Sequence, residues 1–205
     1  MKLLLARHGE TDWNVKSWIQ GSTDIPLNDR GKEQAGQLAN LLVNRQPAIG
    51  AIYTSGLERA RQTAAIVSYQ TGVPYRVEPG LEEFNLGSWE GRTWKQVRVV
   101  YPQEYENWHR NRRYTRIPQG ESYQDLLDRL IPALKRIAAR EQSDTLIVTH
   151  SACIMTLFSY INDTPFEDMV KLYHTENGGI YELDGKQLLA DYFPGINYNI
   201  FESIF

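Results

Sequence analysis

The sequence "LLLARHGET" at residues 3–11 changes character within a few positions. Three leucines and an alanine are followed by a cation, Arg7, an imidazole, His8, and a glycine. A short apolar run bounded by polar residues fits a buried strand, although leucines alone do not distinguish a strand from a buried helix. We therefore predict a strand over residues 2–6 that ends in two basic side chains.

Outward from this stretch, segments of strand and helix character alternate along the chain. Further strands are predicted over residues 51–55, 74–77 and 145–150, and alternating patterns recur near residues 180–183 and 188–193. Helices are predicted over residues 28–45, after the capping-box pairs Ser55–Glu58 and Ser122–Asp125, and over residues 151–160. This alternation predicts a layered α/β domain with a largely parallel sheet.

The whole chain has the composition of one globular domain. Its 205 residues suffice for a single sizeable core, and the net charge of −3 argues against a nucleic-acid or anionic-membrane partner. Any anion site must therefore be built locally. The single cysteine, Cys153, excludes an internal disulfide and favours the reducing cytoplasm. We expect neither a membrane span nor a signal peptide, because every apolar run is too short.

Polar side chains follow several of the predicted strands. Arg7 and His8 follow the first strand, Ser55 and Arg59 follow the second, and His150 ends the strand over residues 145–150. In sheets of this kind ligands bind outside the carboxyl ends of the strands. We therefore expect these groups to meet at one edge, although each of them taken singly would more often be structural or solvated.

This set of groups suits a phosphoryl group better than a metal ion. Two arginines can each fork onto phosphate oxygens. A neutral imidazole can attack phosphorus, a protonated one can stabilise the equatorial oxygens, and a protonated carboxyl can supply the leaving oxygen with its proton. Neither His-x-x-x-His nor a cysteine pair occurs, so we expect no metal and no other cofactor.

Six ordered blocks of the sequence resemble the histidine phosphatase superfamily, the phosphoglycerate-mutase-like proteins. They are "ARHGETDWN" (6–14), "QGSTDIPLNDRGKEQA" (20–35), "IYTSGLERARQTA" (52–64), "LEEFNLGSWEG" (81–91), "PQGES" (118–122) and "LIVTHSACI" (146–154). Arg-His-Gly alone would be weak evidence, whereas six blocks in order are specific. The resemblance implies a three-layer α/β/α sandwich with a mostly parallel sheet that contains one antiparallel strand.

The resemblance also implies roles for individual residues. His8 aligns with the nucleophile, Arg7 and Arg59 with the phosphate-binding arginines, and His150 with the second histidine of the pocket. The pattern Leu-x-Glu selects Glu83 over its neighbour Glu82 as the general acid. The implied substrate-binding residues around the phosphate are Asn14, Gln20, Gly21 and Ser151. The family usually has glycine where Ser151 stands, and a serine there could either crowd the phosphate or add a hydroxyl donor.

We expect one domain over residues 1–205, with residues 89–123 as a cap or insertion that selects the substrate. Arg113 and Tyr114 are the candidate substrate-binding residues of this segment, which is rich in tryptophan and arginine. Such side chains can stack on or clamp a substrate that carries its own ring or negative charge. The alternative is an amphipathic pair of helices with tryptophans in the core and arginines in water.

The main hypothesis is a metal-independent phosphomonoesterase that hydrolyses small phosphorylated metabolites through phospho-His8, with Glu83 as general acid. Mutases of the family are usually longer, so the chain length favours the compact phosphatase branch. The alternatives are a cofactor-dependent phosphoglycerate mutase, an α-ribazole-5'-phosphate phosphatase, and a non-catalytic scaffold that binds phosphorylated ligands. The intact Glu83 argues against the scaffold, because a binding protein needs no proton donor.

Overall fold

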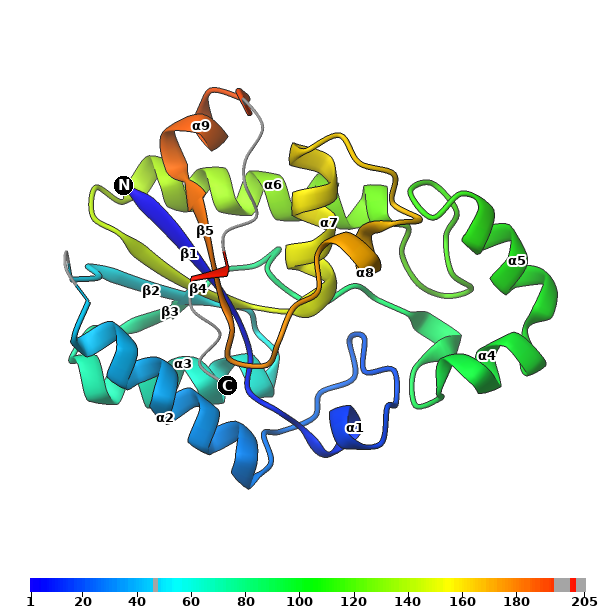
Figure 1. Cartoon of the computed structure of the whole chain (residues 1–205), viewed down its shortest axis with the longest axis horizontal. Helices are drawn as coiled ribbons and strands as arrows, with labels where there is room; N and C mark the ends of the chain where they lie inside the picture. Colours follow the sequence, from blue (N-terminus) through cyan, green and yellow to red (C-terminus); the bar gives the residue numbers. More distant parts are fainter. Residues whose placement is uncertain (46–47, 194–199, 202–205) are drawn as a thin grey trace.

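The computed structural model describes residues 1–45, 48–193 and 200–201, which form a six-stranded sheet flanked by helices (Figure 1). The strands are β1 (Lys2–Arg7), β2 (Ala51–Thr54), β3 (Tyr75–Val77), β4 (Thr145–Thr149), β5 (Ile180–Asp184) and β6 (Ile200–Phe201). Their order across the sheet is β3-β2-β4-β1-β5-β6. Of these strands, β5 runs antiparallel to its neighbours β1 and β6, and the others share one direction.

Helices cover both faces of this sheet. Those described are α1 (Asp12–Val15), α2 (Asp29–Val43), α3 (Glu58–Thr71), α4 (Trp94–Val100), α5 (Pro102–Arg110), α6 (Tyr123–Arg140), α7 (Ser151–Ile161), α8 (Met169–Leu172) and α9 (Gly185–Leu189). Helices α2 and α3 pack on one face, and α6, α7 and α9 pack on the other (Figure 1). The predicted three-layer α/β/α sandwich with one antiparallel strand is confirmed.

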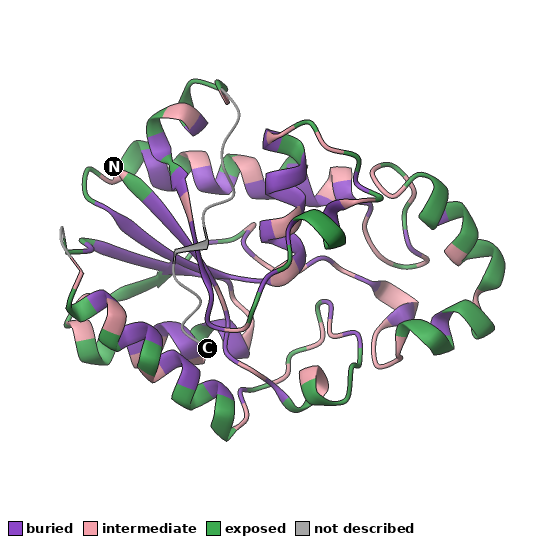
Figure 2. Cartoon of the chain, viewed as in Figure 1, coloured by how far each residue is buried: buried purple, intermediate pink, exposed green. Residues whose placement is uncertain are grey.

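Strand β1 is buried on both faces, which explains its continuous apolar run. Leu3 and Leu5 belong to the core under α6 and α7, whereas Leu4 and Ala6 belong to the core under α2 and α3. Successive side chains of a strand point to opposite faces, so a central strand needs an apolar residue at every position. Figure 2 shows the mostly buried strands β1, β2 and β4 between helices whose outer faces are exposed. This burial makes the end of β1 a rigid support.

Most predicted elements are confirmed, with ends that differ by one or two residues. Two predictions are wrong. Ser55 does not cap the following helix: Leu57 is the N-cap of α3, and the Ser55 hydroxyl bonds His150 instead. The alternating pattern at residues 188–193 forms no strand, because Asp184 caps the short helix α9 and residues after that helix form a turn.

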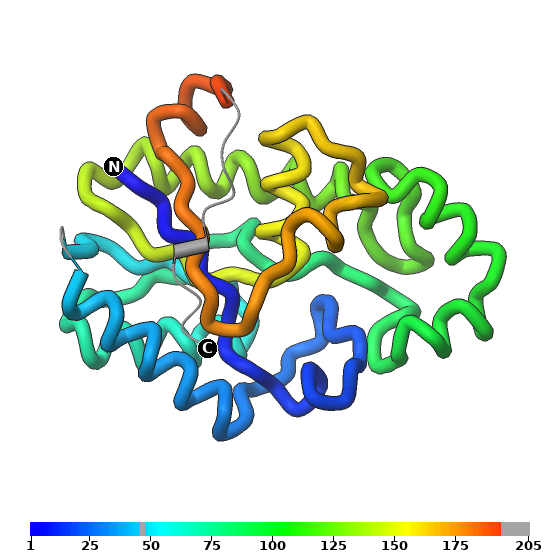
Figure 3. Tube along the Cα trace, in the orientation of Figure 1, coloured from blue at the N-terminus to red at the C-terminus, as the bar shows by residue number. Residues whose placement is uncertain are grey.

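The segment at residues 89–123 lies beside the sheet and contains α4 and α5. The loop after α1 extends to the start of this segment (Figure 3). There the N–H of Ile19 donates to the carbonyl of Arg92 at 2.8 Å, and the N–H of Gly91 donates to the carbonyl of Ile19 at 2.9 Å. The two segments therefore form neighbouring walls next to the carboxyl edge of the sheet.

Candidate active site

Three segments that are distant in sequence meet at the carboxyl ends of the neighbouring strands β2, β4 and β1. Ser55 follows β2, His150 follows β4 and His8 follows β1. The ring centroids of His8 and His150 lie 5.1 Å apart. The Oγ of Ser55 lies 2.6 Å from Nε2 of His150. The sheet therefore brings together the groups that the sequence predicted to meet.

The hydrogen bonding of His8 determines which ring nitrogen can react. Its Nδ1 lies 2.7 Å from the carbonyl oxygen of Gly9, and because a carbonyl only accepts, Nδ1 carries the proton. Burial, together with the charges of Arg59 and Arg7, holds the pKa of His8 well below its ordinary value. The ring is therefore neutral near neutral pH, and its lone pair is on Nε2.

Two guanidinium groups act on His8 electrostatically. Arg59 is buried and donates at 2.7 and 2.8 Å to two carbonyls of the loop at residues 21–23. Arg7 donates to the carbonyl of Thr175 at 2.7 Å. The Nε–H of each arginine is buried and has no hydrogen-bond partner among the described residues. Buried N–H groups are rarely left unpaired, so these two indicate the place of a ligand oxygen.

The lowered pKa of His150 favours a neutral ring in the unliganded protein. Burial lowers the pKa of His150 well below its ordinary value, and the charges of Arg59 and His8 add to this effect. Its Nδ1 is buried and lacks a hydrogen-bond partner within the described chain. A phosphoryl dianion in the site would favour the protonated ring, so a protonated second imidazole in the liganded site stays a prediction.

Glu83 supplies a carboxyl group to the same cavity as Arg7. The N–H of Phe84 donates to its Oε1 at 2.9 Å, and the N–H of Ala152 donates to its Oε2 at 3.3 Å. Burial raises the pKa of Glu83, against the opposing effects of these N–H groups and of the two arginines. A carboxyl group with a raised pKa can hold a proton and deliver it to a leaving oxygen.

The neighbouring Glu82 is placed differently, which supports the choice of Glu83. The carboxylate of Glu82 accepts from the N–H of Gly80 at 2.8 Å and lies 3.9 Å from Nη1 of Arg129. Glu82 does not line the cavity. The two adjacent carboxyl groups therefore have different surroundings: that of Glu83 lines the cavity, and that of Glu82 lies near Arg129.

Asn14, Gln20 and Gly21, which the sequence predicts to bind the substrate, line this cavity. The hydroxyl of Thr11 lies 3.0 Å from Oδ1 of Asn14 and 3.1 Å from Oε1 of Gln20. The amide oxygens thus face Thr11, and the NH₂ groups are the ones that can donate to a ligand. Gly21 has a φ of +52°, and a Cβ at this position would collide with the carboxylate of Glu90. Glycine is therefore required here.

Glu90 organises this wall and was not predicted. Its carboxylate accepts from the N–H groups of Ser22 and Thr23 at 2.8 and 3.0 Å, and from the N–H of Leu86 at 3.1 Å. It therefore ties the loop that contains Gly21 to the segment before the cap. The pattern around Glu90 shows no sign of a partner so far away in the sequence.

Ser151 also lines the cavity, and its hydroxyl is bonded within the protein. Its Oγ lies 2.6 Å from Oγ1 of Thr175, the residue whose carbonyl accepts from Arg7. Ser151 is thus connected through Thr175 to Arg7. A direct contact between Ser151 and the phosphate stays a prediction.

The cavity has a volume of about 650 Å³ and extends from Arg7, Glu83 and Ser151 to the cap. The part of its lining that comes from the cap is aromatic and basic, and comprises Trp94, Arg98, Tyr105, Trp108, His109, Arg112 and Tyr123. Arg113 and Tyr114 do not line it, and Arg113 lines a second cavity, so a contact of these two residues with the substrate stays a prediction. Arg113 instead donates to Oε1 of Gln124 at 2.9 Å and lies over the ring of Phe166, and Tyr114 is exposed. The composition of residues 89–123 suggested a cap over the cavity, but it could not show which of its side chains point into the cavity.

Residues 3–187 match the model of the histidine phosphatase superfamily (branch 1). The chain belongs to this superfamily. Its relatives include a metal-independent phosphoserine phosphatase from Arabidopsis thaliana, 31% identical over 191 residues that cover 92% of this chain and 79% of the relative. A glucosyl-3-phosphoglycerate phosphatase from Mycolicibacterium vanbaalenii is 32% identical over 203 residues, which cover 95% of this chain and 88% of the relative.

The solved structures agree with this assignment. A mycobacterial glucosyl-3-phosphoglycerate phosphatase in complex with VO3 has a TM-score of 0.78 and 30% identity, over 89% of this chain and 90% of that one. The match to 6-phosphofructo-2-kinase/fructose-2,6-bisphosphatase 3 from Rattus norvegicus spans 29% of that longer protein. The predictions of the family, the fold and the phosphatase class are confirmed.

Two further findings concern the described residues. They contain no group of three or more His, Cys, Asp or Glu side chains that could hold a metal ion. Within the same residues, every helix is too short or too polar to cross a membrane.

Proposed function

We propose that this chain is a phosphomonoesterase that hydrolyses small phosphorylated metabolites through a phosphohistidine on His8. The observation that carries the proposal is the pair of buried, unpartnered Nε–H groups of Arg7 and Arg59, next to a neutral His8. A phosphoryl dianion satisfies both donors, compensates both cations and brings phosphorus to the imidazole.

In the first step, Nε2 of His8 forms a bond to phosphorus while the bond between phosphorus and the ester oxygen breaks. Glu83 donates its proton to that oxygen, so an alcohol leaves instead of an alkoxide. The two arginines and His150 stabilise the negative charge on the equatorial oxygens. Side chains thus supply the charge stabilisation that a metal ion supplies in other phosphatases, and the scheme needs no metal.

In the second step, a water molecule attacks phosphorus. The carboxylate of Glu83 accepts a proton from this water, and the bond between phosphorus and Nε2 breaks with its electron pair returning to His8. Inorganic phosphate leaves, and Glu83 is protonated again for the next cycle.

The cap lining favours a substrate with a second anionic group. Arg98 and Arg112 lie over the rings of Tyr105 and Trp108, at 5.1 and 4.6 Å. A stacked guanidinium keeps its in-plane N–H groups for an anion, and the Nε–H of Arg112 is buried without a partner among the described residues. Phosphoserine and glucosyl-3-phosphoglycerate, after which two relatives are named, both carry a carboxylate besides the phosphate.

His8→Ala tests the proposal, with His174→Ala as its control because His174 is exposed and outside the cavity. We expect His8→Ala to reduce hydrolysis of a phosphomonoester panel to background and His174→Ala to keep it. In wild type, an alkaline quench during turnover should trap a phosphoenzyme whose label is on His8. Undiminished hydrolysis by His8→Ala would reject the proposal.

The same preparation distinguishes the phosphatase from a mutase. With 3-phosphoglycerate and catalytic 2,3-bisphosphoglycerate, we expect release of inorganic phosphate. Formation of 2-phosphoglycerate faster than phosphate would instead identify a mutase, because a mutase must exclude water from the phosphoenzyme.

A further inference from the structure

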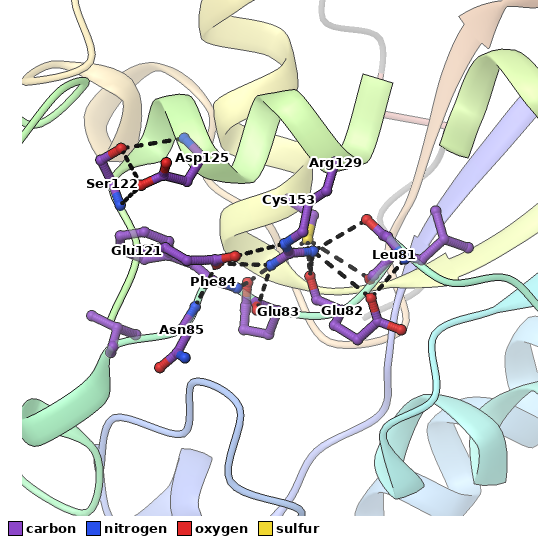
Figure 4. A network of polar contacts seen from close by, with 12 residues as sticks. Leu81, Glu82, Glu83, Phe84, Asn85, Glu121, Ser122, Asp125, Arg129 and Cys153 are labelled. Carbon is purple, nitrogen blue, oxygen red and sulfur yellow. Dashed lines mark hydrogen bonds and ion pairs between the residues drawn. The ribbon is translucent and has the colours of Figure 1, made fainter. Parts of the chain in front are cut away.

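Arg129 extends from α6 to the loop that carries Glu83 (Figure 4). Its Nη1 donates to the carbonyls of Gly80 and Glu82 at 3.1 and 2.7 Å. Its Nη2 donates to the carbonyl of Glu83 at 2.8 Å. Its Nε and Nη2 also donate to the two carboxylate oxygens of Glu121, at 2.8 and 2.9 Å. All five N–H donors of the guanidinium are therefore used within the protein.

Glu121 connects this contact to the far end of the loop. Its carboxylate accepts from the N–H of Asn85 at 3.0 Å, and its own N–H donates to the carbonyl of Asn85 at 2.9 Å. The next residue, Ser122, is the N-cap of α6. The start of α6 and the loop around Glu83 therefore form one hydrogen-bonded unit.

The loop depends on such contacts because residues 81–85 form neither helix nor strand. The carbonyls of residues 81–83 accept from side chains instead of from a ladder of backbone bonds. The carbonyl of Leu81 accepts from Oγ1 of Thr149 at 2.8 Å, and the carbonyl of Glu82 also accepts from Sγ of Cys153 at 3.0 Å. Arg129 binds the carbonyls on both sides of the Glu83 Cα atom, so it holds the backbone from which the Glu83 side chain extends toward the N–H groups of Phe84 and Ala152.

We propose that Arg129, braced by Glu121, is a positioning residue that places the carboxyl of Glu83 for proton transfer to the leaving oxygen. This inference rests on the proposed role of Glu83. Arg129 does not line the cavity, so it acts on the reaction through Glu83 and not by touching the substrate.

A comparison of two leaving groups distinguishes a positioning residue from a merely structural one, because loss of a structural residue should affect both substrates alike. A displaced acid slows the cleavage of esters with poorly acidic alcohols, whereas p-nitrophenolate leaves without a proton. We expect Arg129→Met to lower kcat/KM for β-glycerophosphate by about 10- to 100-fold, and for p-nitrophenyl phosphate by less than about threefold. The parameter kcat/KM is appropriate because it reports the step that breaks the ester bond.

Three further variants complete the test. Glu121→Gln weakens the same brace without removing Arg129, and we expect it to shift the ratio of the two kcat/KM values in the same direction. Arg136→Met is the matched control, because Arg136 is on the same helix and donates to Glu78 at 2.8 Å and to the carbonyl of Pro79 at 3.0 Å, outside the Glu83 loop. It should leave the ratio unchanged. Glu83→Gln removes the acid itself, so it gives the largest loss of kcat/KM for β-glycerophosphate relative to p-nitrophenyl phosphate that the other variants can approach.

The outcomes separate this inference from the proposed function. A selective loss in Glu83→Gln without one in Arg129→Met and Glu121→Gln overturns the positioning role and leaves the function intact. If Glu83→Gln lowers kcat/KM equally for the two substrates, Glu83 is not the general acid, and the inference about Arg129 fails with that assignment. Thermal denaturation monitors folding, and if Arg129→Met does not fold, Glu121→Gln decides the question.

Discussion

His8 and Glu83 share one buried site, yet burial moves their pKa values in opposite directions. Desolvation disfavours the charged form of each group, so it lowers the pKa of the imidazole and raises that of the carboxyl. Both shifts therefore favour an unprotonated imidazole beside a protonated carboxyl. This is the pair of protonation states that the proposed cleavage of the ester requires.

These two directions predict the pH dependence of kcat/KM. As the pH rises through the pKa of Glu83, the acid loses its proton and the rate falls; as the pH falls through the pKa of His8, the nucleophile is protonated and the rate falls. Glu83 therefore produces the alkaline limb. We expect Glu83→Gln to lose this limb with β-glycerophosphate and to be slower by about 100-fold. Ionisation of the substrate is the same for both proteins, so an unchanged alkaline limb in the variant would contradict the assignment.

The sequence predicted the histidines and arginines of the site because each follows a strand or belongs to a family block. It did not predict Glu90 or Arg129, whose partners are far away along the chain and leave no local pattern. It also did not predict that His150 is neutral in the unliganded protein, because that depends on how deeply the fold buries the ring.

At the scale of elements, α4 and α5 add aromatic and basic side chains to the cavity, next to the groups that follow the strands. The prediction for the cap concerns Arg112, which lines the cavity, and its neighbour Arg113, which does not. Arg112→Ala should raise KM for 3-phosphoglycerate by about tenfold, because the loss of one hydrogen bond to a charged group weakens binding by about this factor. It should change KM for glycerol 3-phosphate much less, because this substrate has a hydroxymethyl group in place of the carboxylate.

Arg113→Ala serves as the matched control for this prediction and should leave both KM values unchanged. Equal effects of Arg112→Ala on the two substrates would show that the arginine does not recognise the carboxylate. The proposal that residues 89–123 select the substrate then loses its support.

Elements could be predicted from the sequence where burial or a cap determines the pattern. The leucines of β1 and the capping box at Ser122 are of this kind, and both elements are confirmed. The prediction failed at Ser55, where the capping spacing is present but the hydroxyl is used by His150. A local pattern cannot show that a group from another strand competes for the same oxygen.

At the scale of the molecule, the strand order places the ends of β2, β4 and β1 side by side, and with them the cations of the site. Burial lowers the pKa of Arg7, and the charge of Arg59 adds to this, against the attraction of Glu83. The unliganded fold therefore holds two guanidinium groups in a site with fewer water molecules and counter-charges than they would have in solution. A ligand that supplies negative charge there must stabilise the whole domain.

This argument predicts that inorganic phosphate or orthovanadate raises the melting temperature of the protein. An anion that binds the native state alone adds about 2.7 kcal/mol to the free energy of unfolding when its concentration is 100 times its Kd. Chloride at the same ionic strength should have little effect, which separates binding from screening. Arg59→Met removes one of the two unpartnered donors, so its melting temperature should respond less to phosphate, whatever its own stability. The same phosphate-dependent shift in wild type and Arg59→Met would mean that the anion stabilises the protein from a site other than this one.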